Sequence, residues 1–514
     1  MNTYQKDILI IGAGACGAAL AFEASKRGLD VGLIDAKDIG SGTSSKSTKL
    51  LHGGVRYLEL AFKKFDLSQL KLVEEALNER KYWINKIPYL AKRIDIAIPT
   101  TNFINNNYYK LGMNIYDRLS GKNNLKSSYA LGNAEIQQKF HDISPNFTGG
   151  IIYSDGMFND CRLNLTLALT AEKLGAKIKN YCKLIGFERD NEEKIIAALT
   201  RDINGCEEKW VAKVFVNATG IYSDEIRKLS SNQILNERIL ISKGTHIVLD
   251  KDLCIGGNGL LIPKTKDGRV LFVLPYFGHT LVGTTDQICE IAEVNNPVKE
   301  EKRYLLNSLK EYFSNIEESN ICSIWSGGRP LIKSNKEKLT RNIVREHEIE
   351  ILNSGLVSIL GGKWTTCRKI ALDALSKIQE LMGIEFNEIN NEPLLGSTND
   401  FETTCSGLKK ERIYLLKALP NNNMSIKQID HLQSNYGLQA STVIKNATKN
   451  QLIPISHEIP FCEAEIKYSI INEHAKNVED FLQRRIQLTK VNTIESEKLK
   501  IKVKNIFQKY AKFN

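Results

Sequence analysis

The sequence has little that would indicate a membrane-spanning, secreted or metal-binding protein. No apolar stretch approaches the ~20 residues that a spanning helix needs, and the first apolar run, residues 8–11, is too short for the core of a signal peptide. The ten cysteines form no CxxC pair and no Cys/His cluster with zinc spacing. We therefore expect a reduced, cytoplasmic protein that holds no metal.

Length and composition are those of a large globular protein. Hydrophobic residues make up 42% and charged residues 25% of the chain, which excludes a disordered or fibrous protein. Because single hydrophobic cores rarely grow beyond ~250–300 residues, the 514 residues are predicted to form two or three domains.

The net charge of +11 is concentrated in the last part of the chain. Residues 401–514 contain 18 Lys and Arg against 11 Asp and Glu, an excess of +7. Such an excess is typical of a solvated helical surface, and it also suits an anionic membrane surface or a nucleic acid. The chain has no zinc-finger, RNA-binding-sheet or basic-zipper pattern, so we expect no nucleic-acid partner.

The first 35 residues have the pattern of a β-α-β unit. Residues 7–12 form a nearly continuous apolar run, which is typical of a parallel strand covered on both faces. Residues 18–26 favour a helix that stops at Gly28, and residues 31–34 favour a second buried strand. A parallel, doubly covered sheet is therefore predicted at the start of the chain.

A GxGxxG motif lies at the junction of this strand and helix, at Gly12, Gly14 and Gly17. Gly12 allows the tight turn, Gly14 lets a pyrophosphate approach the backbone, and Gly17 lets the helix pack closely on the strand. Asp35 follows the second strand and is placed to accept a hydrogen bond from a ribose hydroxyl. Together these features predict a dinucleotide-binding domain.

The segment that follows favours FAD over NAD as the dinucleotide. Residues 41–54 contain a run of hydroxyl side chains and end in His52, Gly53 and Gly54. Hydroxyl and backbone N–H groups can follow a diphosphate, and the two glycines can approach a planar ring.

Further strands and Gly-rich turns indicate that the nucleotide-binding domain is discontinuous. A strand at residues 213–216 ends in NATG, and a strand at 356–360 opens onto GGKWTT and a helix at 367–381. Residues 386–402 are aperiodic and are predicted to be a linker. Beyond the linker, helical spacing predicts a separate all-α domain over residues 403–514, with helices at 406–419, 425–435, 462–486 and 494–512.

Taken together, these segments resemble the FAD-dependent, quinone-linked glycerol-3-phosphate dehydrogenases, within the D-amino-acid-oxidase-like flavoproteins. The resemblance is carried by residues 43–59, 153–163, 216–220, 243–246, 283–286, 326–331, 361–366, 462–468 and 484–485. It implies an α/β and α+β fold in which a Rossmann-like FAD-binding domain and a mixed-sheet substrate or cap domain share residues 1–385. The FAD-binding parts are expected at about 1–100, 150–240 and 325–385, and the cap parts at about 101–149 and 241–324.

The resemblance also implies the roles of individual residues. His246, Arg329 and Lys363 are expected at the reacting centre, where His246 either accepts the proton of the substrate hydroxyl or fixes the substrate oxygen. Substrate contacts are expected from Arg56, Tyr57, Arg329, Arg341 and Lys363, because arginine meets phosphate oxygens in a bidentate way. Non-covalently bound FAD is expected to contact Gly12, Gly14, Gly17, Asp35, Thr43, Ser44, Ser45, His52, Gly53, Gly54, Gly220, Gly362, Lys363 and Thr365.

The implied reaction is oxidation of sn-glycerol 3-phosphate, with electrons passed to a membrane quinone. The protein is then expected to lie on the inner face of the cell membrane, attracted to anionic lipid, and a homodimer is left open. One alternative is a glycerol-3-phosphate oxidase, or a related flavoprotein that uses oxygen. Another is a non-catalytic flavin-binding module, for which a set of phosphate-binding cations has no use.

Overall fold

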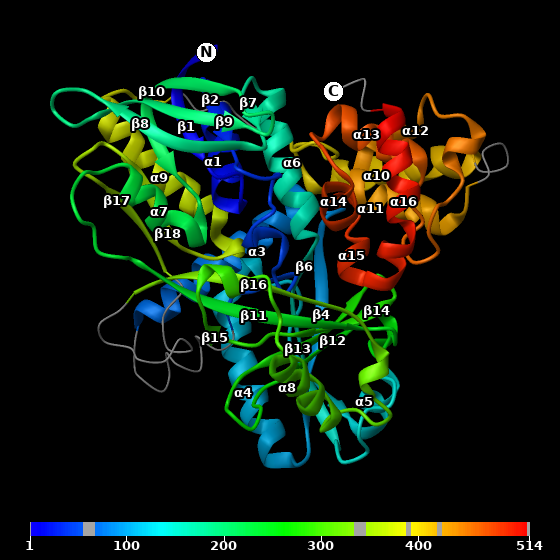
Figure 1. The fold of residues 1–514 in the computed structure, drawn as a ribbon. Coiled ribbons are helices and arrows are strands. Elements are labelled where there is room, and N and C mark those ends of the chain that lie inside the picture. The colour runs from blue at the N-terminus through cyan, green and yellow to red at the C-terminus, as the bar shows by residue number, and fades with distance from the viewer. Residues whose placement is uncertain (1, 55–66, 334–345, 387–391, 419–423, 511–514) are drawn as a thin grey trace.

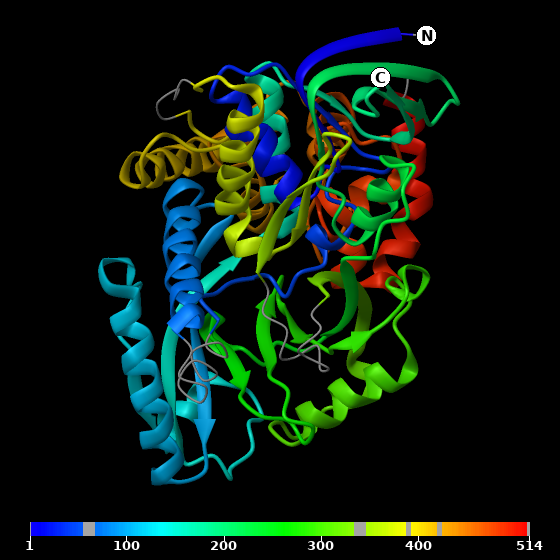
Figure 2. The ribbon, with the colours of Figure 1, turned by 90° about the vertical axis from the view of Figure 1, so that its left-hand side faces the viewer.

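The computed structural model describes residues 2–54, 67–333, 346–386, 392–418 and 424–510. These residues form two sheets, one above the other in Figure 1, with the helices of the C-terminal part beside them. The two chain ends both lie at the top of the molecule in Figure 2. The predicted fold class is confirmed.

The first sheet is the nucleotide-binding sheet, with eight strands. Its central strand β1 (Asn2–Ile11) pairs in parallel with β2 (Val31–Ile34) on one side and with β10 (Glu207–Asn217) on the other. The other strands are β7 (Lys177–Lys179), β8 (Cys182–Arg189), β9 (Ile195–Asp202), β17 (His347–Ile351) and β18 (Val357–Gly361). Helices α1 (Ala15–Ser25), α6 (Asp160–Lys173) and α9 (Cys367–Met382) share one core with it.

The second sheet has ten strands and is mixed. Its strands are β3 (Leu50–Leu51), β4 (Ala91–Thr100), β5 (Tyr129–Gly132), β6 (Gly149–Phe158), β11 (Ile239–Leu249), β12 (Gly259–Ile262), β13 (Leu271–Tyr276), β14 (His279–Gly283), β15 (Gln287–Ile288) and β16 (Ile321–Ile332). Helices α5 (Asn133–Lys139) and α8 (Lys299–Lys310) pack on one face, and α3 (Leu67–Lys86) and α4 (Phe103–Ser120) belong to the same half.

The predicted boundaries between FAD-binding and cap parts differ from these sheets. Residues 91–100, 149–158 and 321–332 belong to the second sheet, although most of them were assigned to the FAD-binding part. The reason is long-range pairing: β4 and β6 are antiparallel over all ten residues, and β16 follows β11 along its whole length. No local pattern in the sequence reveals such partners.

The C-terminal part is helical over its described residues, as predicted. It contains α10 (Phe401–Ala418), α11 (Ile426–Tyr436), α12 (Ala440–Ile444), α13 (Glu463–Asn472), α14 (Val478–Asp480), α15 (Leu488–Val491) and α16 (Thr493–Tyr510). The segment 462–486 is not one continuous helix, because the chain turns after Asn472 and His474 takes a left-handed φ of 55°. Many of these helices pack on the second sheet in a shared core.

Candidate active site

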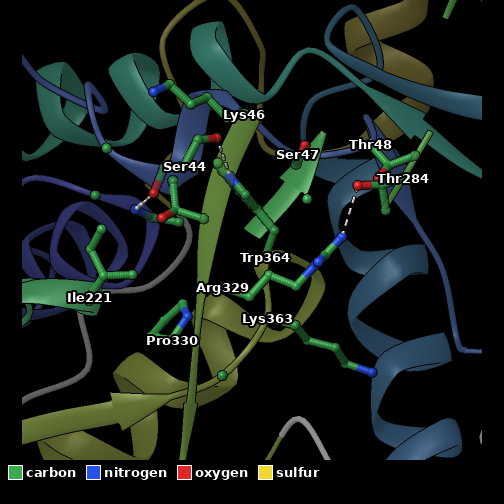
Figure 3. A pocket seen from close by; sticks show the side chains of 18 of the residues that line it. Ser44, Lys46, Ser47, Thr48, Ile221, Thr284, Arg329, Pro330, Lys363 and Trp364 are labelled. Carbon is green, nitrogen blue, oxygen red and sulfur yellow. Dashed lines mark hydrogen bonds between the residues drawn. The ribbon is translucent and has the colours of Figure 1, made fainter. Parts of the chain in front are cut away.

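A cavity of about 1120 Å³ lies where residues of the two sheets meet. The nucleotide-binding sheet contributes the ends of β1, β2 and β18, and the second sheet contributes residues of β11 and β16. Figure 3 shows part of the lining, including the cationic side chains of Arg329 and Lys363. The cavity therefore joins the predicted dinucleotide site to the predicted reacting centre.

The glycine motif forms the turn that the sequence predicts. Gly12 has a φ of 104°, which favours glycine, and a Cβ there would lie 2.6 Å from the carbonyl oxygen of Ala218. A Cβ on Gly17 would collide with the carbonyl oxygen of Gly12, so Gly17 is what allows α1 to lie close to β1. Gly12 and Gly14 line the cavity.

Asp35 also lines the cavity, at the end of β2. Its Oδ2 accepts a hydrogen bond from Ala13 N at 2.8 Å, and its Oδ1 accepts one from Lys37 N at 2.8 Å. Burial raises the pKa of this carboxyl to about 6. The oxygens are thus fixed in place beside the glycine turn, as a ribose-binding acceptor requires.

The hydroxyl-rich segment closes over the start of α1. Ser44 Oγ accepts a hydrogen bond from Ala15 N at 2.8 Å, and the carbonyl of Ser44 accepts one from Trp364 Nε1 at 2.8 Å (Figure 3). Thr43 Oγ1 donates to the carbonyl of Gly328. The segment is therefore held by both sheets and lies between the glycine turn and β16.

His246 is held on β11 between a ring and a glycine. Its imidazole stacks on Trp325 with ring centroids 4.2 Å apart, and a Cβ on Gly283 would collide with it. Its Nε2 lies 2.9 Å from Thr48 Oγ1, while the buried Nδ1 has no hydrogen-bond partner among the described residues. Burial, with Arg329 and Lys49 nearby, lowers the pKa of His246 well below 6.5. The imidazole is therefore neutral at physiological pH.

Arg329 reaches the cavity from β16. Its guanidinium donates from Nη2 to Thr284 Oγ1 at 3.0 Å (Figure 3). It also donates from Nη1 to Ser242 Oγ at 3.3 Å. A Cβ on Gly244 would collide with Nη2, so the glycine leaves room for this side chain. These contacts hold a planar cation at the cavity wall.

Two lysines add positive charge to the lining. Lys363 precedes the short turn that opens α9 and extends along the same wall as Arg329 in Figure 3. Lys46, which we did not predict as a site residue, donates to Asn295 Oδ1. Burial lowers the pKa of Lys46 to about 8. The cavity is thus suited to an anionic ligand.

Most of the predicted site residues line one cavity. Those that do so are Gly12, Gly14, Asp35, Thr43, Ser44, His52, Gly54, Gly220, His246, Arg329, Gly362, Lys363 and Thr365. Gly17, Ser45 and Gly53 are not among its described lining residues. Gly17 packs against Gly12, the carbonyl of Ser45 accepts a hydrogen bond from Lys49 Nζ, and Gly53 N donates one to the hydroxyl of Tyr116. Arg56, Tyr57 and Arg341 lie outside the described residues, so their predicted substrate contacts stay predictions.

Sequence reasoning missed several residues of the lining. Thr48 contacts the imidazole of His246, Trp364 contacts the Ser44 carbonyl, and Thr284 contacts Arg329. The hydroxyl run of residues 41–48 was a signal for Thr48, because it extends to that residue. No signal in the sequence indicates that Thr284 and Arg329 meet, since their contact depends on the pairing of β11 with β14 and β16.

These features fit FAD by the shape and chemistry of the site. The cavity has a glycine turn, a fixed carboxylate and a hydroxyl-rich loop along its length, which match the pyrophosphate and ribose of a dinucleotide. Its second half has aromatic and cationic side chains beside a neutral histidine. Such a lining suits a ring system that reacts with an anionic substrate.

Comparison with known proteins agrees with this geometry. Residues 7–366 match the family model described as FAD dependent oxidoreductase, and residues 389–514 match the C-terminal domain of alpha-glycerophosphate oxidase. A mitochondrial glycerol-3-phosphate dehydrogenase of Arabidopsis thaliana is 36% identical, over 95% of this chain and 80% of that protein. The enzyme of the same name from Rattus norvegicus is 34% identical, over 96% and 69%.

The chain belongs to the family of FAD-dependent glycerol-3-phosphate dehydrogenases. Its cofactor is FAD. Among solved structures, the glycerol-3-phosphate dehydrogenase from Bacillus halodurans complexed with FAD has the same fold, with a TM-score of 0.78 at 23% identity, covering 99% of this chain and 91% of that one. The L-alpha-glycerophosphate oxidase of Mycoplasma pneumoniae, also with FAD bound, covers 76% of this dehydrogenase-family chain with a TM-score of 0.59 at 18% identity.

Proposed function

We propose that this protein oxidises the C2 hydroxyl of sn-glycerol 3-phosphate and produces dihydroxyacetone phosphate. One observation carries the proposal: a single cavity brings the FAD-binding turn together with the cations Arg329 and Lys363 and the neutral imidazole of His246. The curated relatives bear the name of this activity, which supports it further.

Arg329 and Lys363 bind the phosphate of the substrate. The guanidinium of Arg329 is oriented by Thr284 and Ser242, so it can present two N–H groups to phosphate oxygens with little loss of side-chain freedom. Arg56 and Arg341, from outside the described residues, are proposed as further substrate contacts, with Tyr57 as a hydroxyl contact. Binding the phosphate fixes the distance from the cationic wall to the C2 hydroxyl.

His246 takes the proton of that hydroxyl through Thr48. The Thr48 hydroxyl lines the cavity and lies 2.9 Å from Nε2, so it can accept the substrate proton while it donates its own to the imidazole. The neutral ring is in the state that this step needs. Bound FAD would supply the acceptor for the hydride that leaves C2.

Anaerobic reduction of the purified holoenzyme tests the choice of substrate. We expect sn-glycerol 3-phosphate to bleach the visible flavin absorbance in the absence of oxygen. Glycerol, which lacks the phosphate, and D-alanine, which offers a carboxylate and an amine instead, are the matched controls and should leave the flavin oxidised. Bleaching by D-alanine, and not by glycerol 3-phosphate, would refute the proposal.

We further propose that the electrons pass to a membrane quinone and that the protein meets the bilayer from its cytoplasmic side. Among the described residues, no helix has the length and apolarity needed to cross a membrane. Helix α4 supports a one-sided contact, because its side chains at Phe103, Ile104, Tyr108 and Leu111 are exposed. The helix itself lies at the edge of the molecule in Figure 2. Tyr108 and Leu111 also line the cavity.

Charge alone would favour a different contact surface, on the C-terminal helical part, where the basic excess lies. Several basic side chains of the C-terminal helices form ion pairs with neighbouring carboxylates, including Lys500 with Glu479, Lys509 with Glu463, and Arg412 with Asp430. These pairs reduce their attraction to anionic lipid. Apolar insertion of α4 is therefore proposed as the larger contribution.

The acceptor is tested by comparing reoxidation of the reduced holoenzyme by oxygen and by a soluble quinone analogue. We expect the quinone to reoxidise the flavin faster than air-saturated buffer does. Binding to anionic vesicles should fall when Ile104 and Leu111 are both changed to Ser, with Ile203→Ser, an exposed residue on the opposite half, as control. Faster reoxidation by oxygen, without vesicle binding, would favour the alternative of a glycerol-3-phosphate oxidase.

A further inference from the structure

Three cations from a short segment of the C-terminal helical part reach into the FAD-binding half of the molecule. They are Arg484, Arg485 and Lys490, and all three are buried. Each has at least one partner in residues 35–49, which connect β2 to β3 and which we call the FAD loop. This loop contributes Asp35, Thr43, Ser44 and other residues to the cavity lining.

Lys490 binds the backbone of the FAD loop. Its ammonium Nζ lies 2.5 Å from the carbonyl oxygen of Ser45 and 3.2 Å from Cys161 Sγ, and the residue is 5% exposed. Lys49 Nζ donates to the same carbonyl at 3.0 Å and to Asp160 Oδ1 at 2.6 Å. The Ser45 carbonyl is thus held by two lysines in a buried setting.

This carbonyl lies at the end of the short turn Thr43–Ser45. Thr43 and Ser44 line the cavity, whereas the buried Ser45 is not among its described lining residues. The two lysines therefore hydrogen-bond to the turn on the side away from the cavity. A hydrogen bond from a charged donor is about twice as strong as a neutral one. The hydrogen bonds to the Ser45 carbonyl therefore hold the turn so that Thr43 and Ser44 face the cavity.

The same contacts extend to the proposed proton path. Ser47 donates to Asp160 Oδ2 from its backbone N at 3.1 Å and from its Oγ at 2.7 Å. The next residue is Thr48, which contacts His246. A shift of the turn at Ser45 would therefore also move Thr48, three residues later, relative to His246.

Arg484 and Arg485 hold the other end of the loop. Arg484 Nε lies 2.5 Å from Asp38 Oδ2, and Arg485 donates to both carboxylate oxygens of Asp38, at 2.7 and 2.9 Å. Asp38 is fully buried and follows Asp35 by three residues. Both ends of the FAD loop are thus anchored by one segment of the C-terminal part, residues 484–490.

We propose that the C-terminal helical part is a component of the FAD site, and that Lys490 is a positioning residue that holds the turn Thr43–Ser45 in its FAD-binding conformation. This inference rests on FAD as the cofactor and not on the substrate or the electron acceptor. Its failure would leave the proposed reaction untouched, and its success would not support that reaction.

The test measures how fast the holoenzyme releases FAD after dilution, followed by the rise in flavin fluorescence. We expect Lys490→Met to release FAD at least ten times faster than the unchanged protein. The visible circular dichroism of the bound flavin should also change, because the turn beside it is displaced.

Gln428→Met is the matched control. Gln428 is fully buried in the same C-terminal part and donates to the carbonyl of Leu452 at 2.9 Å, far from the FAD loop in the sequence. This variant also removes one buried side-chain-to-carbonyl hydrogen bond, so it should lower Tm while FAD release and the flavin spectrum stay as they are. Lys490→Gln, a milder change that keeps a polar group without the charge, should also release FAD faster.

The proposal is overturned if the Lys490 variants release FAD at the normal rate. It is also overturned if Gln428→Met speeds release as much for the same loss of Tm, because FAD loss would then report general loosening of the C-terminal part.

Discussion

The surroundings of His246 set both the orientation and the protonation state of its imidazole. Stacking on Trp325 and contact with Gly283 leave it one orientation, and burial beside Arg329 and Lys49 keeps it neutral. A neutral imidazole can accept a proton, but one whose pKa is well below 6.5 does so with less driving force than an exposed histidine. The short path through Thr48 offsets this, because the proton has only one hydroxyl to cross.

The first prediction concerns this pair. His246→Gln should lower kcat/KM about 10²–10⁴-fold, which is the usual contribution of a general base, while FAD stays bound. Thr48→Val should cause a loss of the same order, since it removes the hydroxyl of the path. Equal turnover in Thr48→Val and the unchanged protein would show that the proton takes another route.

The pH dependence of the unchanged enzyme follows from the same pKa. Only the neutral ring can act as base, and its lowered pKa keeps it neutral as the pH falls below 6.5. The acid limb of kcat/KM should therefore lie well below pH 6.5. An acid limb at 6.5 that disappears in His246→Gln would contradict the burial described here.

The second prediction concerns Arg329. Arg329→Lys should preserve the fold and FAD, but it replaces a planar donor pair by a single ammonium. Loss of one charge-assisted hydrogen bond, at about 1.5–3 kcal/mol, corresponds to a ten- to hundred-fold loss in kcat/KM for glycerol 3-phosphate. Steady-state kinetics measure this, and unchanged parameters would exclude Arg329 from phosphate binding.

Among the elements, those with strong local patterns were predicted well. The strand at 31–34 matches β2, and the helix predicted at 367–381 matches α9 (Cys367–Met382) closely. Continuous apolar runs and Gly-rich turns are local signals, so they need no knowledge of the rest of the fold. The break in 462–486 was missed because a left-handed residue such as His474 leaves no periodic trace.

Contacts between distant elements were beyond what the sequence could reveal. The pattern Arg484–Arg485 was noted as fitting the family, but nothing local indicates that both residues bind Asp38 more than 440 positions earlier. The Thr284 contact of Arg329 was missed for the same reason. Residue types at the site were therefore predictable, whereas their hydrogen-bond partners were not.

The third prediction concerns the junction between Asp38 and the two arginines. Asp38→Asn removes the buried carboxylate that Arg484 and Arg485 share, although Asp480 still pairs with Arg484 and Glu473 still lies 3.8 Å from Arg485. The change should lower the free energy of unfolding by about 3 kcal/mol, the lower end of the usual cost of breaking a buried ion pair. Glu207→Gln, which breaks an ion pair on the surface with Arg201, is the control and should cost less than about 1 kcal/mol. Urea unfolding measures both, and a small effect of Asp38→Asn would mean that the junction adds little stability.

The junction should also be sensitive to acid. Burial alone raises the pKa of Asp38, but Arg485 and Arg484 outweigh it and lower the pKa from 3.8 to about 2. A carboxyl with a lowered folded pKa stabilises the fold fully above its unfolded value and loses that contribution as the pH falls through its folded value. Stability from this junction should therefore be complete above about pH 4 and decline towards pH 2, and Asp38→Asn should remove this part of the acid dependence.

On the scale of the whole molecule, three parts of the chain contribute to one reaction. The nucleotide-binding sheet supplies the glycine turn and Asp35, the second sheet supplies His246 and Arg329, and the C-terminal helical part anchors the loop between them. Each part supplies something that the others lack. In the proposed reaction, this shared cavity binds glycerol 3-phosphate so that a hydride leaves its C2.

The most direct test is the rate of anaerobic flavin reduction in a rapid-mixing experiment, with sn-glycerol 3-phosphate carrying either hydrogen or deuterium at C2. We expect full loss of the visible flavin absorbance with both substrates and formation of one dihydroxyacetone phosphate per flavin. Reduction should be slower with deuterium, because the C2–H bond breaks in this step. If the flavin stays oxidised after mixing with either substrate, the proposed reaction is wrong.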